Sequence, residues 1–353
     1  MTREDLFNIR INSPNQEIEK CIKKRWDSIA KPLDSMGEFE KIISKIGAIL
    51  DTKEVDITKR AAIIMCADNG IVEEGISQSG QEVTALVAKA MGKGESTVNK
   101  LAKSNNTDVI VVDIGMNYRG VIEGVQNKKV NFGTKNFLKE PAMAEKEVLM
   151  AISIGIQAVM ECKKKGYKMI ATGEMGIGNT TTSSAIIAAL LGSEAKNVVG
   201  RGAGLTNKAL ERKKQVVDEA LIKYKLQKED TFNILMTFGG LDIAGLVGVY
   251  IGGAIYHIPI VIDGIISVTA ALVAKRLVTG TEKYMIASHK SKEPAMQVVL
   301  RELGLSSVID AGLALGEGTG AIMLLSLLDM VLAIYRNYTS FEAIQVEQYI
   351  RQV

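Results

Sequence analysis

Ala61-Ala62-Ile63-Ile64-Met65-Cys66-Ala67 is a short apolar run that leads directly into the turn residues Asp68-Asn69-Gly70. Such a run, bounded by turn residues, is typical of a strand buried on both faces. The pattern recurs before helical stretches, at residues 109–112, 168–172, 235–238, 260–262 and 285–287. Strands that alternate with helices predict an α/β fold with a doubly wound, mainly parallel, Rossmann-like sheet.

The turns after these runs are rich in acidic residues and glycine. In doubly wound sheets, ligands bind in the crevice beyond the carboxyl ends of the strands, so we expect these turns to line one site. The sequence patterns at the two ends of the chain, residues 1–50 and 321–353, predict helices and no strand of this kind. We therefore expect an α/β catalytic domain over residues 59–320 and a smaller helical domain built from residues 1–58 and 321–353.

The composition is that of a globular protein, with 47% hydrophobic and 24% charged residues among 353. Lys and Arg number 43 against 40 Asp and Glu, without a basic arm, so we expect no nucleic-acid partner. Three cysteines without CxxC spacing argue against a disulfide framework and a zinc site. The first residues lack the apolar core of a signal peptide, and together these features predict a cytoplasmic protein.

Residues 243–262 are nearly uninterrupted apolar sequence of about the length that spans a bilayer. Asp242 and Asp263 flank the segment, His257 lies within it and Pro259 breaks it. These features favour a buried, glycine-rich helix followed by a short strand. We therefore expect no membrane association.

The segment Gly173-Glu174-Met175-Gly176-Ile177-Gly178-Asn179-Thr180-Thr181-Thr182 joins a predicted strand to a predicted helix. Backbone N–H groups and hydroxyls in such a turn can bind an anion at the helix N-terminus. The spacing is that of a Walker A loop, but Asn179 occupies the lysine position, which favours a monophosphate over ATP. A glycine turn with a threonine N-cap would look similar, but Glu174 at the strand end favours a functional role.

Gly200-Arg201-Gly202-Ala203-Gly204 is a second glycine cluster, before a helix that starts near Asn207. The third glycine is misplaced for a dinucleotide fingerprint and no acidic residue follows a second strand, so phosphate or ribose contact is the better interpretation. Lys213 in the following helix could neutralise a phosphate. An exposed helical lysine would only solubilise the protein.

Glu317 is the single carboxylate of the glycine-rich segment Leu315-Gly316-Glu317-Gly318-Thr319-Gly320, which precedes an apolar helix. Burial there would raise its pKa and make it a serviceable general base. Viewed alone, the residue fits a helix-capping role better than a catalytic one.

The sequence lacks the motifs that several other enzyme chemistries require. The two histidines, His257 and His289, form no metal-binding pair, and no GxSxG nucleophile elbow occurs. Val111-Val112-Asp113-Ile114-Gly115 lacks the acidic pair and threonine-rich loop of the diphosphate-dependent phosphoribosyltransferases. The sequence therefore predicts neither a metal nor another cofactor.

Taken together, an ordered set of segments resembles the nicotinate-nucleotide:dimethylbenzimidazole phosphoribosyltransferases of cobamide lower-ligand activation. The resemblance covers nearly the whole chain. The segments are Lys31-Pro32, Ala67-Asp68-Asn69-Gly70, Val83-Thr84, Asp113-Ile114-Gly115, Gly133-Thr134-Lys135-Asn136, Gly173-Glu174-Met175-Gly176, Asn179-Thr180-Thr181, Val199-Gly200-Arg201-Gly202, Gly239-Gly240-Leu241-Asp242, Asp263-Gly264, Ser288-His289 with Ser291, and Leu315-Gly316-Glu317-Gly318.

The resemblance implies transfer of 5-phosphoribose from nicotinate mononucleotide to an aromatic base, with nicotinate and an α-ribotide as products. It implies that Glu317 is the general base, that Glu174 assists in the same pocket, and that members are usually homodimers. The resemblance also implies a base pocket at Ser79, Gln81, Leu315 and Gly316. Phosphate and ribose contacts are implied for Gly176, Gly178, Asn179, Thr180, Arg201, Gly202, Lys213, Gly264 and Ser291.

The chain departs from many relatives at Asn69, where they have His, and at Ser79-Gly80, where they have Tyr-Pro. The second departure leaves the acceptor base open among dimethylbenzimidazole, simpler benzimidazoles, adenine and a phenol. One alternative function is a homologous partner subunit of a hetero-oligomeric phenol-activating enzyme. Another, suggested by the glycine clusters, is a nucleotide-dependent dehydrogenase.

Overall fold

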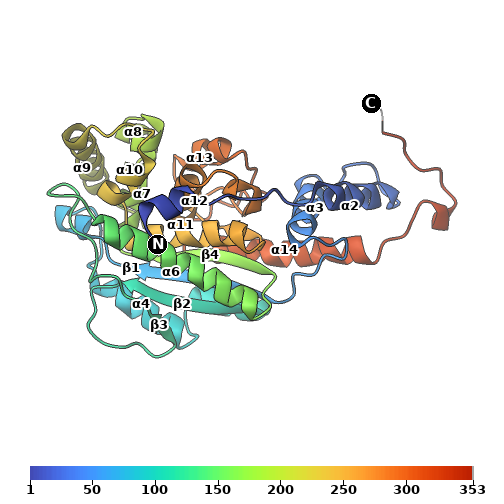
Figure 1. The fold of residues 1–353 in the computed structure, drawn as a ribbon, viewed down its shortest axis with the longest axis horizontal. Helices are drawn as coiled ribbons and strands as arrows, with labels where there is room; N and C mark the ends of the chain where they lie inside the picture. The colour runs from blue at the N-terminus through green and yellow to red at the C-terminus, as the bar shows by residue number, and fades with distance from the viewer. Residues whose placement is uncertain (352–353) are drawn as a thin grey trace.

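The computed structural model describes residues 1–351 and contains one six-stranded, all-parallel sheet with helices on both faces (Figure 1). The strand order is β3-β2-β1-β4-β5-β6, which is that of doubly wound dinucleotide-binding folds. The predicted fold class is confirmed. The strands are β1 (Arg60–Ala67), β2 (Thr107–Gly115), β3 (Val125–Asn127), β4 (Met169–Met175), β5 (Ile260–Ile262) and β6 (Met285–Ala287).

The helices fall into an N-terminal group, the crossovers of the sheet and a long C-terminal helix. Three short 3-10 segments, Gly70–Glu74, Thr281–Tyr284 and Glu342–Ile344, complete the regular structure. The α-helices are α1 (Arg3–Phe7), α2 (Gln16–Ser28), α3 (Glu38–Leu50), α4 (Glu82–Gly92), α5 (Thr97–Ser104), α6 (Glu145–Lys164), α7 (Asn179–Leu191), α8 (Ala195–Val198), α9 (Asn207–Tyr224), α10 (Thr231–Phe238), α11 (Leu241–Ile255), α12 (Ile265–Leu277), α13 (Met296–Leu303) and α14 (Thr319–Arg336).

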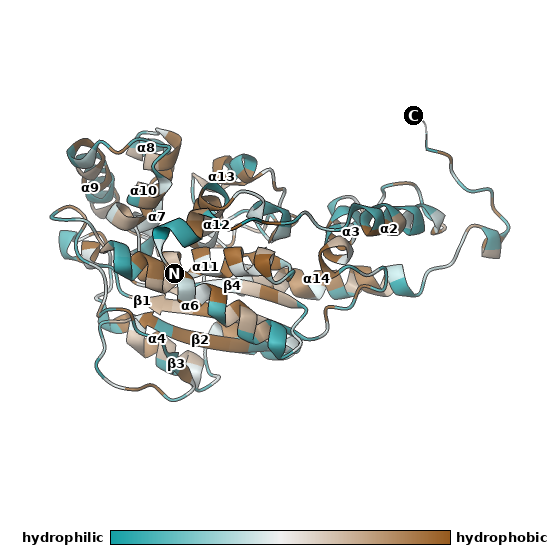
Figure 2. Cartoon of the chain, viewed as in Figure 1, coloured by the Kyte–Doolittle hydropathy of each residue, from teal (hydrophilic) through white to brown (hydrophobic). Residues whose placement is uncertain are grey.

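The strand quoted first, β1, is buried along its whole length and separates two hydrophobic cores. Ala61, Ile63 and Met65 face the core formed with α6, α7, α10, α11, α12 and α13. The residues of β1 between them, Ala62, Ile64 and Cys66, face the core formed with α2 to α5 and α14. Because successive side chains of a strand point to opposite faces, a doubly covered strand must be apolar throughout. Figure 2 shows hydrophobic residues along the strands and α11.

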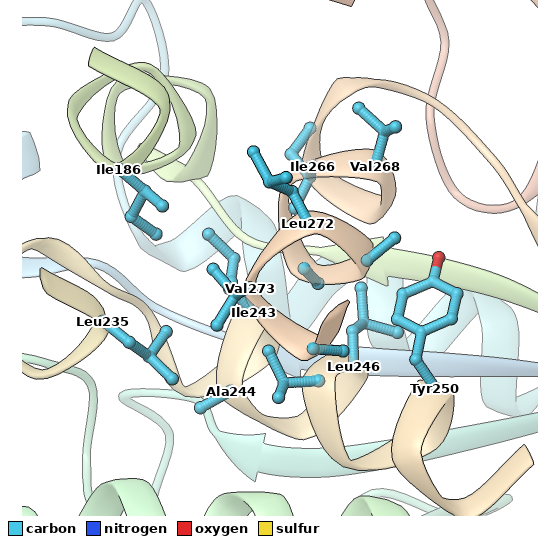
Figure 3. Packing of buried hydrophobic residues seen from close by; sticks show 14 of the residues in the cluster. Ile186, Leu235, Ile243, Ala244, Leu246, Tyr250, Ile266, Val268, Leu272 and Val273 are labelled. Atoms are coloured by element: carbon cyan, nitrogen blue, oxygen red, sulfur yellow. The ribbon is translucent and has the colours of Figure 1, made fainter. Parts of the chain in front are cut away.

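The prediction of a strand at residues 235–238 is wrong, because these residues form the second half of α10. The side chain of Asp230 accepts a hydrogen bond from the backbone N–H of Asn233 and so caps the helix at its start. Four apolar residues then pack into the core, and Figure 3 shows Leu235 in one cluster with Ile243 of α11 and Val273 of α12. A short apolar run alone does not distinguish a strand from a buried helix.

The sequence interpretation also missed β3, a three-residue strand at the edge of the sheet whose residues are half-buried or exposed. The segment 243–262 forms the buried helix α11 and the strand β5, as predicted. By length and composition, α14 could cross a membrane, but more than half of its apolar window is buried within the protein. A core helix of a soluble protein passes the same test.

The helices α2 and α3 pack with the C-terminal half of α14 beside the sheet and extend away from it (Figure 1). The first helix, α1, lies apart from them and packs on α10, where Phe7 contacts Phe232. Trp26 of α2 packs on Tyr335 of α14 with ring centroids 5.1 Å apart, and the Tyr335 hydroxyl donates to the Lys53 carbonyl at 2.9 Å. The expected division at residue 320 falls inside α14. Beyond Arg336, residues to 351 hold no α-helix, contrary to the expected C-terminal helices, since most are exposed and lack the packing that stabilises a helix.

Candidate active site

A cavity of about 250 Å³ lies beyond the carboxyl ends of β4, β5 and β6. Its walls come from the end of β4, the N-termini of α7 and α12, and the loops that follow Gly200, Ser288 and Ala314. Most of the predicted site residues line this one cavity: Glu174, Gly176, Asn179, Thr180, Gly202, Ser291, Leu315, Gly316 and Glu317.

The other predicted residues lie outside the cavity lining. Gly178 and Gly264 are the N-caps of α7 and α12. Arg201 is exposed and donates to the carbonyl of Leu205 at 2.7 Å, within its own loop. Ser79 is exposed, and Gln81 donates to the backbone carbonyl of Asn69 at 3.2 Å.

One end of the cavity combines the N-terminus of a helix with hydroxyl groups. Gly178 has a φ of 95°, a left-handed conformation that favours glycine, and it starts α7, whose first residues Asn179 and Thr180 line the cavity. Thr180 in the first turn receives a hydrogen bond from Lys213 Nζ at 2.8 Å. The hydroxyl of Ser291 is buried at the same cavity without a hydrogen-bond partner, as a group awaiting a ligand would be.

Lys213 is fully buried, so it is not the exposed, solubilising lysine that its helical position allowed. Besides Thr180, its ammonium group donates to the Gly200 carbonyl at 3.2 Å. Burial lowers the pKa of Lys213 to about 8, and the nearby carboxylate of Glu293 opposes that shift. Lys213 therefore places a buried ammonium group behind the hydroxyl of Thr180, at this end of the cavity.

Glu174 ends β4 opposite Met65 of β1, and its side chain is buried at the cavity. The Asn179 amide donates to Glu174 Oε2 and also to Asp242 Oδ2, the latter at 3.0 Å. Burial raises the pKa of Glu174 to about 8, and the carboxylate of Asp242 adds to this effect. Burial likewise raises the pKa of Asp242, to about 6.

Glu317 lies in a left-handed turn with a φ of 60°, between two glycines that also have positive φ. Asp263, after β5, accepts hydrogen bonds from the backbone N–H groups of Gly318 at 3.1 Å and Ala321 at 3.0 Å. Asp263, not Glu317, therefore caps α14. Among the described residues, Glu317 Oε2 is buried without a hydrogen-bond partner. Burial raises the pKa of the carboxyl group, and a hydrogen bond from the backbone of Val98 opposes that shift.

Close backbone approach fixes the Glu317 turn against β4. A Cβ atom on Gly173 would lie 2.8 Å from the backbone carbonyl of Glu317, so only glycine fits there. On the other side, a Cβ on Gly320 would lie 2.2 Å from the ring of His289. His289 is buried and bonds to the Ser288 hydroxyl at 2.9 Å, and burial lowers its pKa. His289 therefore packs against the first turn of α14, next to the Glu317 turn.

Several cavity residues gave no clear signal in the sequence. Val87, Ile265 and Ile266 form apolar wall, and ordinary helix periodicity hides such residues. Glu293 accepts a hydrogen bond from the backbone N–H of Gly202 at 2.9 Å and so joins the loops that carry Gly202 and Ser291. Within residues 1–351, no group of three or more His, Cys, Asp or Glu side chains could hold a metal ion.

A family model described as phosphoribosyltransferase matches residues 11–346. Curated proteins named nicotinate-nucleotide–dimethylbenzimidazole phosphoribosyltransferase are 45% identical in Clostridium perfringens, over 91% of this chain and 89% of that protein, and 44% identical in Acetivibrio thermocellus, over 94% and 95%. The chain belongs to this phosphoribosyltransferase family. The resemblance inferred from the ordered sequence segments is confirmed.

Solved structures of the nicotinate-nucleotide–dimethylbenzimidazole phosphoribosyltransferase family share the fold. The crystal structure of CobT from Thermus thermophilus superposes with a TM-score of 0.88 at 32% identity, and the match covers 94% of this chain and all of that one. The family fold therefore extends through the chain-end helices as well as the sheet. This chain is a phosphoribosyltransferase, a pentosyl-transferring enzyme.

Proposed function

We propose that the chain transfers 5-phosphoribose from nicotinate mononucleotide to 5,6-dimethylbenzimidazole or a related aromatic base, and forms an α-ribotide and nicotinate for the cobamide nucleotide loop. The observation that carries this proposal is the position of Glu317. Within the described residues, a half-buried carboxylate with one unpartnered oxygen lines the same cavity as the N-terminus of α7. A proton acceptor and an anion site in one cavity are what this transfer requires.

In the proposed reaction, the hydroxyl groups of Thr180 and Ser291 hold the phosphate, with Lys213 behind Thr180 and the Gly202 loop beside it. A ring nitrogen of the base attacks the anomeric carbon from the face opposite the nicotinate, and the bond from that carbon to the pyridinium nitrogen breaks. Glu317 takes the proton from the attacking base. Nicotinate leaves from a cationic ring, so its departure needs no general acid.

The predicted base pocket divides into two parts. Leu315 and Gly316 line the cavity together with Val87 and Met175, so an apolar wall is present for an aromatic ring. Ser79 and Gln81 lie outside this lining, and we propose that they act on base choice indirectly, through the loop before α4. Competition among dimethylbenzimidazole, benzimidazole, adenine and phenol, with the ribotides identified by mass, would rank the acceptors.

The purified chain alone should release nicotinate from nicotinate mononucleotide when a benzimidazole is added. One chain brings both Glu174 and Glu317 to one cavity, which supports turnover without a second homologous chain. Nicotinate release is followed by chromatography, with each substrate omitted in turn as the control. If no base supports turnover unless a homologous partner is added, the partner-subunit alternative replaces this proposal. Tight NAD binding without nicotinate mononucleotide binding would instead favour a dehydrogenase.

We also propose that the enzyme is a cytoplasmic homodimer. Four apolar residues recur on one face of α14 at the spacing of a helix-packing stripe, Met323, Leu327, Met330 and Ile334. Met330 is 65% exposed and Ile334 is 40% exposed, which leaves this face without a partner in the single chain. An apolar helix face of this kind supports association with a second copy.

Met330→Glu should therefore convert the dimer to monomers, because a charge on an apolar helix interface must be desolvated on association. Sedimentation velocity would show loss of the species of twice the chain mass. Ile222→Glu is the matched control, since Ile222 is an exposed apolar residue on α9, at 68% exposure. A dimer that survives Met330→Glu but dissociates with Ile222→Glu would place the interface elsewhere.

A further inference from the structure

The buried carboxylates of Glu174 and Asp242 share one hydrogen-bond donor. The side-chain amide of Asn179 donates to Glu174 Oε2 and to Asp242 Oδ2, and no cation of the described chain is paired with either carboxylate. Both side chains are buried, Asp242 completely. Two negative charges on one amide in a low-dielectric interior would repel strongly, so the pair must hold a proton.

The surroundings of the two carboxylates decide which one is ionised. Asp242 lies in the first turn of α11, where the helix dipole favours negative charge, and its Oδ1 accepts from the backbone N–H of Ile243 at 3.0 Å. Glu174 has only the amide of Asn179 as a donor. The negative charge therefore stays on Asp242, and the proton stays on Glu174.

The free oxygen of Glu174 faces the cavity. Its Oε2 is occupied by Asn179, whereas a Cβ on the cavity residue Gly316 would lie 2.9 Å from Oε1. A proton on Oε1 would thus point toward the space that Gly316 leaves open. Other acidic groups face the pair as well: Asp263 after β5 and Glu317 before α14 face Glu174, Cys66 of β1 lies near it, and Asp68 faces Asp242.

We propose that Asp242 is a positioning residue that, through Asn179, keeps Glu174 protonated, so that Glu174 offers a hydrogen-bond donor to an acceptor atom of the bound substrate. The raised pKa of Glu174 agrees with this arrangement. This arrangement gives the two glutamates of the cavity different roles. Glu174 donates a hydrogen bond to the substrate, and Glu317 accepts the proton of the base. The inference deepens the proposed transfer reaction and rests on it.

The direct test is infrared spectroscopy of the full chain with ¹³C-labelled glutamate and aspartate. The unliganded wild-type protein at pH 7 should show the C=O band of one buried protonated carboxylic acid, and Glu174→Gln should lack it. Asp242→Asn keeps an oxygen acceptor for the amide of Asn179 but removes the charge, so the band should disappear at a lower pH than in the wild type, by about 1 to 2 units. Asp310→Asn, at an exposed carboxylate, is the control.

Turnover provides a second readout at saturating nicotinate mononucleotide, where phosphate affinity no longer contributes. In the wild type, kcat should fall at high pH as Glu174 loses its proton. In Asp242→Asn this alkaline limb should move to lower pH by a similar amount, because removal of a neighbouring negative charge lets Glu174 ionise at lower pH. Glu174→Gln should show no such limb, since its amide has no proton to lose.

Absence of the band in the wild-type protein, or an unchanged titration in Asp242→Asn, would overturn the inference. If Asp242→Asn does not fold, the wild-type and Glu174→Gln spectra still decide whether Glu174 is protonated, which the inference requires. The infrared result does not depend on activity. A protein that shows the band but lacks transfer would refute the proposed function instead, whereas transfer without the band would refute the protonated state of Glu174 and the role of Asp242, and leave the transfer reaction standing.

Discussion

Replacement of Glu317 by Gln is expected to lower kcat by about 10² to 10⁴-fold, the usual contribution of a positioned general base. Gln has nearly the same shape and fits the left-handed turn, but its amide cannot take the proton of the attacking base. The anion end of the cavity is built from α7 and the Gly202 loop, so the KM for nicotinate mononucleotide should change little. Steady-state kinetics with a benzimidazole acceptor separate the two parameters.

Glu302→Gln is the matched control, because Glu302 is an exposed glutamate on α13. The pH dependence gives a second check. Burial raises the pKa of Glu317, and the ionised form is the active base, so kcat of the wild type should rise with pH through a value above that of an ordinary glutamate. A kcat within twofold of the wild type in Glu317→Gln would remove the assignment of Glu317 as base.

Replacement of Lys213 by Met should raise the KM for nicotinate mononucleotide by about 10- to 100-fold, because hydrogen bonds that involve a charged group contribute about 1.5 to 3 kcal/mol. Met preserves much of the buried volume but removes the cation behind Thr180. Calorimetric binding of the mononucleotide measures the loss without turnover.

The neighbouring residue supplies the control for this variant. Lys214 pairs with Glu211 on the surface of α9, so Lys214→Met should bind the mononucleotide as the wild type does. Burial lowers the pKa of Lys213 to about 8, and the protonated form attracts phosphate, so wild-type affinity should weaken as the pH rises above about 8. Equal losses in both lysine variants would show that Lys213 has no special role.

Much of the fold could be predicted because doubly covered strands have a clear signature. Strands such as β1 and β4 are apolar runs that end in acidic or glycine turns, and the chain-order alternation with helices fixes a parallel sheet. The segment 235–238 was assigned to the wrong element because its apolar residues suit either a strand or a buried helix. Only the cap at Asp230 and packing against α7 and α12 decide for the helix.

The lining of the cavity could be predicted where one local segment carries the residues, as in the turns that hold Glu174 and Glu317. Features that depend on residues far apart in the sequence could not be predicted from it. The burial of Lys213 follows from how α9 packs on α7, and the contact of Asn179 with Asp242 joins residues 63 positions apart. No pattern within either segment contains that information.

The most direct measurement of the central claim follows both products of one reaction by NMR. Wild-type chain, nicotinate mononucleotide and dimethylbenzimidazole should give nicotinate and a ribotide of α configuration in equal amounts, because the base attacks from the face opposite the leaving ring. Glu317→Gln should give almost neither. Formation of the β-ribotide, or nicotinate release without any ribotide, would contradict the account.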